Sequence, residues 1–548
     1  MAGGILAALD KSSSRKGLVL ALYAASVAYF LGIILLPTTI GVLTKLGSAQ
    51  QVFADPALFD RAISAIKSSF GLAFLVSSLD LIAGIPLAWL IARRKSSLIG
   101  VLDWLVDLPL IVPTVTLGYS ALLFWSSDNP FGFLGMQPLS PGWVLVLLLH
   151  FCFSYPVVVR VMVSKIMELD QMYEIAGRTL GATPLTAARS ISIQLLSSGI
   201  VASFLLAFSR SLSETGATIV VAGIFENGPV FIRRAKEAGM DGPMVFTSLA
   251  LILLSLLVYY LVRYLGVRVR IPFIRAWPDI EKKLSGKETT TVRDVLTVLI
   301  FVFFIMSPTI FLSLKYAPSL FGSQVLSQFL SSTGIWSSFW ASLILSYSIG
   351  LVVGVINTVF SIPMAIIIAR RRFGKLPATI LDGLTAVPLI IPSVALGASM
   401  GLFWGGLRTL PEFLLIVFAH LSITYPYLVA TMVSAFEDIP PYFEESARTL
   451  GANAFTVFRT VTLPMAKYSL ISGIMLTFTR SVDETGATLA VVSQLKTVPV
   501  LLVDWIRSAF PGSDLAAGFG TLLLLLISFF ILLMLRLLTR PGERFAKS

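Results

Sequence analysis

The chain has 548 residues, of which 56% are hydrophobic and only 13% are charged, and its mean hydropathy is +0.88. Soluble domains carry roughly 25% charged residues, so this composition excludes a soluble globular protein and indicates a protein that lives in a lipid bilayer. The net charge of +12 does not indicate nucleic-acid binding, because the basic residues lie at the ends of apolar segments, where they orient membrane helices. The single cysteine, Cys152, excludes an internal disulfide and a Cys-based metal cluster.

The first half of the chain contains six apolar segments, each close to the roughly 20 residues that a membrane helix needs. The first follows a polar start and is too long for the core of a signal peptide, so a retained helix is predicted. Pro109 and Pro113 predict kinks in the third segment, where neighbouring helices satisfy the freed backbone groups. The predicted spans are residues 17–43, 69–92, 98–125, 141–164, 190–213 and 243–265, with a mixed loop over residues 46–68.

The second half repeats this plan after the most charged stretch of the chain, residues 263–293. Its predicted spans are residues 294–314, 340–369, 376–404, 412–435, 466–482 and 516–538. The chain is therefore predicted to be an all-α polytopic membrane protein with about twelve transmembrane helices. They form two six-helix repeats, residues 1–266 and 294–548, joined by a cytoplasmic linker over residues 267–293.

An internal duplication relates the two halves. Three pairs of elements share an offset of 270 residues: RTLGA at residues 178–182 and 448–452, ETGAT at 214–218 and 484–488, and the only two histidines, His150 and His420. Two further pairs have offsets of 277 to 279: A-R-R at residues 92–94 and 369–371, and P-L-I-[VI]-P at residues 109–113 and 388–392. A register kept over this length indicates a repeat.

Lysine and arginine residues predict the orientation in the membrane. If the N-terminus is inside, the cytoplasmic segments hold 28 of the 41 basic residues and the outer segments hold ten. This bias predicts that both termini and the linker are cytoplasmic and that the protein is a multi-pass protein of the plasma membrane. Because each half has an even number of spans, the halves run parallel, related by an axis along the membrane normal.

Each half carries an amphipathic element on the predicted cytoplasmic side, between its fourth and fifth spans. Residues 173–195 and 441–464 each predict a short helix, a sharp turn and a second short helix. Gly181 and Gly451 fit the turn, because glycine adopts positive φ without a Cβ clash. No G-x-x-x-x-G-K-[ST] phosphate loop occurs, so the chain cannot bind ATP by that route. Two symmetric elements fit two copies of an external partner.

The E-x-A-x-x-x-G pattern of Glu445, Ala447 and Gly451, followed by Leu463-Pro464, resembles the coupling-helix signature of binding-protein-dependent ABC importer permeases. The resemblance implies a type I importer fold in which each coupling helix sits in a groove of an ATPase subunit. It implies two copies of an ABC ATPase subunit, an extracytoplasmic substrate-binding protein and the lipid bilayer as partners. ATP would be bound by the partner subunits, with no cofactor on this chain.

The resemblance also implies which residues couple the chain to the ATPase. They are Glu174, Ala176, Gly181, Glu444, Glu445, Ala447 and Gly451. The first half departs from the pattern, since Ile175 replaces the glutamate, Gly177 replaces the alanine and Ile193-Gln194 replaces Leu-Pro. We therefore expect two unequal contacts, with the second repeat carrying more of the coupling.

Two sets of motifs indicate different substrates. The fused two-half layout and HFCFSYP at residues 150–156 resemble permeases for ferric iron and thiamine. The P-L-I-[VI]-P and E-T-G-A-T motifs resemble permeases for molybdate, tungstate or sulfate. We expect a small inorganic ion, either ferric iron or an oxyanion, or else thiamine, and the sequence leaves the sign of its charge open.

Two charged pairs are candidate pathway or gate residues. Arg210 with Glu214, and Arg480 with Glu484, are i,i+4 pairs near the predicted outer ends of the fifth and eleventh spans. Arg before Glu is the weaker orientation for stabilising a helix, which favours a gate or pore-lining role.

Other polar residues within the spans have two interpretations. Asp80, whose equivalent is Asn357, is an intramembrane carboxylate and hence a pathway candidate, but a hydrogen bond between helices would also explain it. His150 and His420 are expected to pack helices together rather than to contact substrate.

A secondary transporter with two parallel repeats is the main alternative. Such a transporter should carry substrate or coupling-ion residues near mid-membrane on interrupted helices. Here Asp80 has no charged equivalent, and the clearest repeated element is cytoplasmic. A receptor or scaffold that transports nothing would leave both cytoplasmic elements without a purpose.

Overall fold

The structure is a computed structural model, which describes residues 16–94, 96–127, 130, 138–266, 278–320, 324–332, 334–406, 410–508 and 513–539. Within these ranges every regular element is helical. In the same ranges, nine helices are long and apolar enough to cross a membrane, and three bent helix pairs bring the total to twelve. The predicted all-α architecture of about twelve spans is therefore confirmed.

By residue number, the helices divide between the two predicted repeats. Those of the first repeat are α2 (Lys16–Tyr29), η1 (Phe30–Leu35), α3 (Leu36–Ile40), η2 (Gly41–Ala49), α4 (Gln50–Ala54), α5 (Pro56–Arg93), α6 (Ser97–Leu105), α7 (Leu108–Ile111), α8 (Thr114–Leu122), η3 (Leu123–Ser127), α9 (Trp143–Glu168), α10 (Met172–Thr179), α11 (Pro184–Ala187), η5 (Ala188–Ser192), α12 (Ile193–Leu195), α13 (Ser197–Ser213), α14 (Gly216–Val221), α15 (Gly228–Glu237) and α16 (Asp241–Gly266).

Helix α17 and the first turns of α18 lie in the predicted linker, before the predicted second repeat. Its elements, with that helix, are α17 (Pro278–Leu284), α18 (Lys287–Ile300), η6 (Phe301–Met306), α19 (Ser307–Tyr316), η7 (Ala317–Leu320), α20 (Gln324–Leu330), α21 (Trp336–Ala369), α22 (Lys375–Thr385), α23 (Val387–Ile390), α24 (Ser393–Gly405), α25 (Glu412–Glu437), α26 (Pro441–Thr449), α27 (Ala454–Val457), η8 (Phe458–Thr462), α28 (Leu463–Val482), α29 (Gly486–Val491), α30 (Val498–Arg507) and α31 (Ser513–Thr539).

The two proline motifs break the third span of each repeat. The helices on either side of the break are bent by 101° in the first repeat and by 103° in the second. Val112 has an extended backbone, with φ −70° and ψ 127°, because Pro113 disfavours the helical conformation of the residue before it. The predicted kinks are confirmed.

The predicted loop over residues 46–68 is wrong, because this stretch is helical. η2 and α4 extend to Ala54, and α5 begins at Pro56. Asp55 caps α5, since its Oδ1 accepts hydrogen bonds from the backbone N–H groups of Ala57 (3.0 Å) and Leu58 (3.3 Å). A proline after the cap is also a start signal. Hydropathy marks only the part of a helix inside the bilayer, so it does not reveal the polar first turns of α5.

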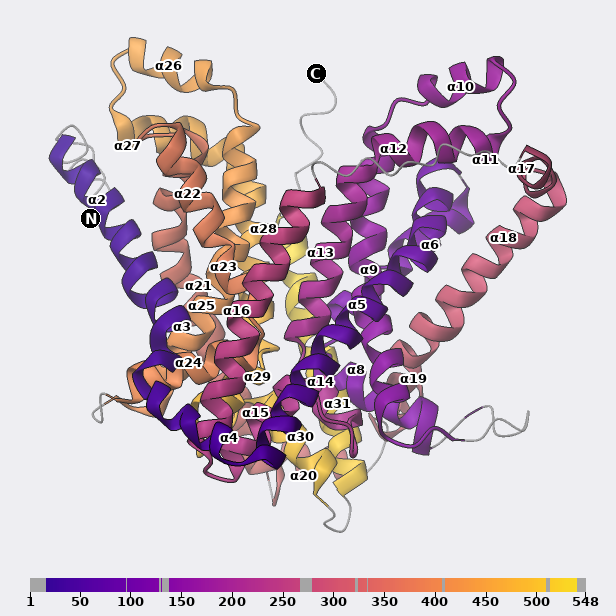
Figure 1. The fold of residues 1–548 in the computed structure, drawn as a ribbon. Coiled ribbons are helices and arrows are strands. Elements are labelled where there is room, and N and C mark those ends of the chain that lie inside the picture. Colours follow the sequence, from indigo (N-terminus) through magenta and orange to yellow (C-terminus); the bar gives the residue numbers. More distant parts are fainter. Residues whose placement is uncertain are drawn as a thin grey trace.

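The first span of each repeat packs against the other repeat (Figure 1). The ring of Tyr29 stacks on Phe360 with 4.1 Å between centroids, and its hydroxyl donates to Asn357 Oδ1 (3.2 Å). Reciprocally, Phe301 stacks on Tyr155 in the first repeat, with 6.2 Å between centroids. The two repeats are thus interlocked by an exchange of their first helices.

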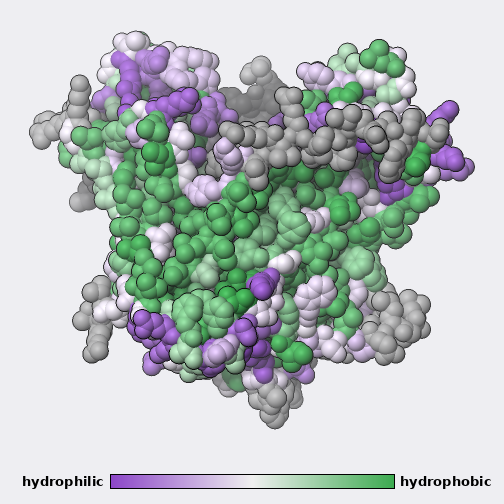
Figure 2. Space-filling model, in the orientation of Figure 1, coloured by the Kyte–Doolittle hydropathy of each residue, from purple (hydrophilic) through white to green (hydrophobic). Residues whose placement is uncertain are grey.

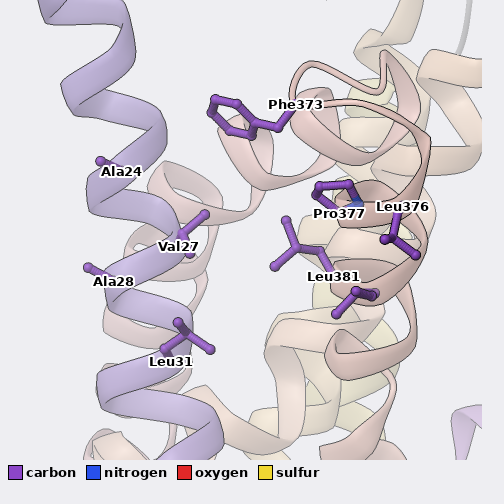
Figure 3. Close-up of a pocket in the computed structure, with 9 residues that line it drawn as sticks. Ala24, Val27, Ala28, Leu31, Phe373, Leu376, Pro377 and Leu381 are labelled. Carbon is purple, nitrogen blue, oxygen red and sulfur yellow. The ribbon is translucent and has the colours of Figure 1, made fainter.

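The molecule has two polar ends. α10 and α26 lie at one end, which we call the α10–α26 end, and α15 and α30 lie at the other, the α15–α30 end (Figure 1). Figure 2 shows a broad apolar belt between these ends, with hydrophilic side chains gathered above and below it. A belt of this kind fits the hydrocarbon layer of a bilayer. Within the belt, an apolar gap of about 650 Å³ separates α2 from α22, with side chains such as Val27 and Leu381 directed into it (Figure 3).

Candidate functional site

A tight turn follows the short helix of each amphipathic element. Gly181 has φ +94° and Gly451 has φ +87°, a region that L side chains rarely adopt. The Gly451 N–H donates to Arg448 O (2.9 Å), and the Ala452 N–H donates to Ala447 O (3.1 Å). The first repeat makes the equivalent pair of bonds. These bonds satisfy carbonyls at the helix end and fix the direction in which the chain leaves it.

An ion pair ties each short helix to the end of the second span in its repeat. Arg93 Nη2 lies 2.8 Å from Glu174 Oε1, and Arg370 Nη2 lies 2.8 Å from Glu444 Oε1. The same Oε1 atoms accept hydrogen bonds from Ser192 and Thr462, respectively. Sequence analysis missed this contact, although the repeated A-R-R and glutamate positions would have suggested it. Glu174 and Glu444 therefore face inward and hold α10 and α26 in place.

The outer faces of α10 and α26 are exposed and partly apolar. Leu180 and Leu450, at equivalent positions, are both 89% exposed. Ile175, Ala176 and Glu445 are exposed as well, whereas Ala447 is half-buried. Exposed apolar side chains on a rigid helix are typical of a surface that a partner protein covers.

A compensating pair explains why Gly177 stands where the second repeat has Ala447. A Cβ at Gly177 would lie 2.5 Å from Ile191 Cδ1. The residue equivalent to Ile191 in the second repeat is Val461, which is smaller by one methylene. The two repeats thus fill the space behind the short helix in two ways. The first repeat has the smaller residue on the helix and the larger one opposite it, and the second repeat has the reverse.

A cavity of about 480 Å³ lies between the two repeats, and we call it the central cavity. Its lining includes both arginines of the predicted pairs, Arg210 and Arg480. Ser209 and Thr479, and the proline-motif residues Leu110 and Leu389, line it from equivalent positions. The central cavity is therefore built from matching parts of the two repeats.

The two E-T-G-A-T segments cross at the end of the central cavity that is farther from α10 and α26. A Cβ on Gly216 would lie 2.7 Å from Thr485, and a Cβ on Gly486 would lie 2.7 Å from Thr215 Oγ1. The segments approach so closely that only glycine fits at each crossing position. They close the cavity toward the α15–α30 end.

The glutamates of the predicted pairs lie behind the arginines and do not line the central cavity. Glu214 Oε1 accepts a hydrogen bond from the Ala217 N–H (3.1 Å), and Glu484 Oε1 accepts one from the Ala487 N–H (2.9 Å). Each carboxylate thus caps the first turn of α14 or α29. Both side chains are nearly fully buried.

The two charged pairs are unequal. Arg480 Nη2 lies 2.7 Å from Glu484 Oε2, whereas Arg210 Nη1 lies 3.9 Å from Glu214 Oε2. Asp483, whose equivalent is Ser213, lines the central cavity and accepts a hydrogen bond from the Thr114 N–H (2.9 Å) at the start of α8. This bond joins the second repeat to the first.

Asp80 lies away from the central cavity. It is fully buried in α5, where it accepts a hydrogen bond from Ser154 Oγ, and its Oδ1 has no partner among the residues described by the structure. Its equivalent Asn357 donates to Thr424 Oγ1 (2.8 Å) and also accepts from Tyr29. Both residues therefore link neighbouring helices.

The two histidines make equivalent bridges to the E-T-G-A-T segments. His150 Nδ1 lies 2.8 Å from Ser211 Oγ, and His150 Nε2 lies 2.8 Å from Thr218 Oγ1. The same two ring atoms of His420 each lie 2.9 Å from the equivalent hydroxyls. Both rings are buried, and neither lines the central cavity. The contacts fit the expected role in helix packing.

Comparison with known proteins finds one family twice in this chain. A model of the family described as "Binding-protein-dependent transport system inner membrane component" matches residues 84–271 and 361–540. The sulfate transport system permease protein of Salmonella typhimurium is 31% identical over 217 residues, which cover 38% of this chain and 78% of that protein. A probable molybdenum ABC transporter permease protein of Haloferax volcanii is 32% identical over 193 residues, covering 34% of this chain and 70% of that protein. The molybdenum transport system permease protein of Haemophilus influenzae is 29% identical over 219 residues, covering 36% and 93%.

These matches exclude the alternative of a secondary transporter. The relatives are transport permease subunits rather than enzymes. Because the family model matches once in each repeat, the chain carries two such domains in one polypeptide. The chain belongs to the family of inner membrane components of binding-protein-dependent transport systems, the permeases of ABC importers.

Proposed function

We propose that this chain forms the complete membrane pathway of an ABC importer for a tetrahedral oxyanion such as sulfate, molybdate or tungstate. The observation that carries the proposal is the central cavity, into which Arg210 and Arg480 project from equivalent positions of the two repeats. The relatives named above transport sulfate and molybdenum according to their names. The proposal combines this likeness with the chemistry of the cavity.

Two arginines suit an oxyanion better than a cation. The guanidinium group presents its N–H donors in a planar fork that matches oxyanion geometry, and it is more weakly hydrated than an ammonium group. Asp483, the carboxylate that lines the same cavity, already accepts a bond from the Thr114 N–H. The cavity therefore offers donors to an anion, whereas ferric iron would need a set of oxygen ligands.

The short helices α10 and α26 are proposed as the contacts for two ATPase subunits. Their exposed faces, with Leu180 and Leu450, would be covered by the partners. Movement of either helix would reach the second span of its repeat through Arg93–Glu174 or Arg370–Glu444. The crossed E-T-G-A-T segments would then separate, and the cavity would open to a binding protein at the α15–α30 end. This places the α10–α26 end in the cytoplasm, in line with the charge bias of the sequence.

Uptake measurements test the substrate class. Cells that express the chain with its ATPase and binding protein should take up [35S]sulfate or [99Mo]molybdate, and each should compete with the other. Replacing Arg480 with Gln removes charge-assisted hydrogen bonds worth about 1.5–3 kcal/mol, so uptake at low substrate should fall by roughly 10- to 100-fold. Arg480→Lys, which keeps the charge, should retain part of the uptake.

Two results would contradict the proposal. Uptake of ferric iron or thiamine, with no competition by oxyanions, would assign the pathway to the other substrates expected from the sequence. Normal oxyanion uptake by the Arg210→Gln/Arg480→Gln double variant would exclude the arginines from the pathway.

A further inference from the structure

A second group of arginines lies at the α15–α30 end, outside the central cavity. Arg233 on α15 is only 6% exposed, and its Nε donates to Glu237 Oε1 (2.7 Å). Its Nη2 lies 3.8 Å from Asp504 Oδ1, on α30 of the other repeat. Its Nη1 has no hydrogen-bond partner among the described residues. A buried guanidinium N–H without an acceptor is costly, which points to an acceptor from outside the chain.

A cavity of about 230 Å³ adjoins this side chain, and we call it the Arg233 cavity. Arg234, Arg507 and the carboxylate of Glu237 line it together with Arg233. Arg507 is the most accessible of the three, with 45% of its side chain exposed, and its Nη1 lies 3.9 Å from Glu237 Oε1. Three guanidinium groups therefore line one small cavity, and the exposed Arg507 lies on the side of the cavity nearest to the surface.

The charges around the Arg233 cavity do not balance. Two ion-pair networks border it, and among the described residues they hold five cations and three carboxylates. Arg61 and Arg234 pair with Glu226, and Arg233, Arg507 and Lys496 pair with Glu237 and Asp504. Burial is the largest effect on the pKa of Arg233 and lowers it, Glu237 and Asp504 raise it, and the charge of Arg507 lowers it. The positive excess and the repulsion between Arg233 and Arg507 would both be relieved by a bound anion.

The second repeat has no copy of this arrangement. The offset of 270 places Val503 at the position of Arg233, and Asp504 at that of Arg234. Lys236, which also lies on α15, contacts the second repeat. Its Nζ donates to Leu489 O (2.8 Å) and Val492 O (3.0 Å) and so covers the end of α29. The arginine cluster is therefore not a packing device that the fold requires in each repeat.

We propose that the Arg233 cavity is a reception site for a small divalent oxyanion at the α15–α30 end. The site adjoins α14, since Ile219 and Val220 also line it. α14 has six residues and thus a length of about 9 Å, and its first residue, Gly216, lies in the crossing that closes the central cavity. An anion at Arg233 would be bound just outside this crossing. The choice of an oxyanion rests on the proposed function.

Equilibrium binding of [35S]sulfate to the purified full-length chain in lipid nanodiscs tests the site. The measurement is made in an Arg210→Gln/Arg480→Gln background, which removes the arginines of the central cavity. We expect this variant to bind sulfate, and addition of Arg507→Gln to weaken the binding about tenfold or more. Arg61→Gln is the matched control, because Arg61 pairs with Glu226, the partner of Arg234, but does not line the cavity, and it should leave the affinity unchanged.

The outcomes separate this site from the proposed function. No sulfate binding in the Arg210→Gln/Arg480→Gln background, or equal binding with and without Arg507→Gln, would overturn the reception site whatever the chain transports. If Arg507→Gln leaves sulfate binding intact and abolishes stimulation by the binding protein, the cavity receives a carboxylate of that protein instead. Arg234→Gln provides the same test should Arg507→Gln reduce the melting temperature of the chain. Failure of oxyanion uptake with intact sulfate binding would count against the proposed function alone.

Discussion

Replacing Gly451 with Val should uncouple the second repeat from its ATPase subunit. Gly451 has φ +87°, and a Cβ built on it meets no atom within 4 Å. The substitution therefore acts only through the backbone, where a left-handed conformation costs an L residue about 1–2 kcal/mol, and more when the residue is β-branched. This cost lowers the population of the native turn roughly tenfold or more. α26 should then point in a wrong direction while the membrane spans stay folded.

The assay is retention of the ATPase on the purified chain, together with uptake and the amount of chain in the membrane. Gly451→Val should lose ATPase and uptake at a near-normal amount of chain. Gly451→Asn is the control, because asparagine tolerates positive φ, and it should stay close to the wild type. Full ATPase retention and normal uptake by Gly451→Val would refute the assignment of α26 as a coupling element.

The same change in the first repeat, Gly181→Val, should have a milder effect on ATPase binding. Gly181 has a similar φ of +94°. However, the linker helix α17 holds the helix that follows this turn, since Glu281 Oε1 lies 2.7 Å from Arg189 Nε and Ser285 Oγ accepts from the Leu185 N–H (3.2 Å). Gly181→Val should therefore retain more ATPase than Gly451→Val, and equal losses in the two variants would contradict this brace.

Three further predictions concern charge. Glu214→Gln with Glu484→Gln keeps the oxygens that cap α14 and α29 but removes the charges behind the arginines. Uptake, or its coupling to ATP hydrolysis, should therefore change at a normal amount of chain in the membrane. Wild-type values for both would exclude a role of these two charges in transport. Lys282→Cys should react with an impermeant maleimide only from the cytoplasm and Lys496→Cys only from outside, and the reverse result would invert the topology. Burial lowers the pKa of Lys236 from 10.5 to about 8, against the opposing effect of a nearby carboxylate. Between these values the unfolded chain binds more protons than the native chain, so stability should rise with pH through this window; melting of Lys236→Met should not show this rise.

The spans, the repeat and the kinks were predictable because each leaves a local pattern. Hydropathy marks the part of a helix inside the bilayer, a constant offset marks a duplication, and Pro113 disfavours a helical residue before it. The turn at Gly451 was predictable for the same reason, since glycine adopts a backbone with positive φ more readily than other residues. The start of α5 was not predicted, because the low hydropathy of its first turns outweighed the two start signals, Asp55 and Pro56.

Contacts between distant residues were not predictable. The exchange of first helices depends on pairs such as Tyr29 and Asn357, which no local pattern connects. Among the candidate site residues, Arg210 and Arg480 do line the central cavity, but Glu214 and Glu484 cap helices behind it and Asp80 lies elsewhere. A carboxylate within a span has several possible partners, and the sequence does not say which of them the fold brings close.

The exchange of first helices also sets an order of events during synthesis. The hydroxyl of Tyr29 has its partner at Asn357, 328 residues later. At about 5–20 residues per second, the ribosome needs on the order of 16 to 66 s to make the intervening chain. Throughout that time α2 is in the bilayer without α21, and the Tyr29 hydroxyl lacks the amide oxygen that accepts its hydrogen bond. We therefore expect the first repeat to complete the packing of α2 only after α21 has been made, and a ribosome that stops in the linker leaves α2 without the helix on which it packs.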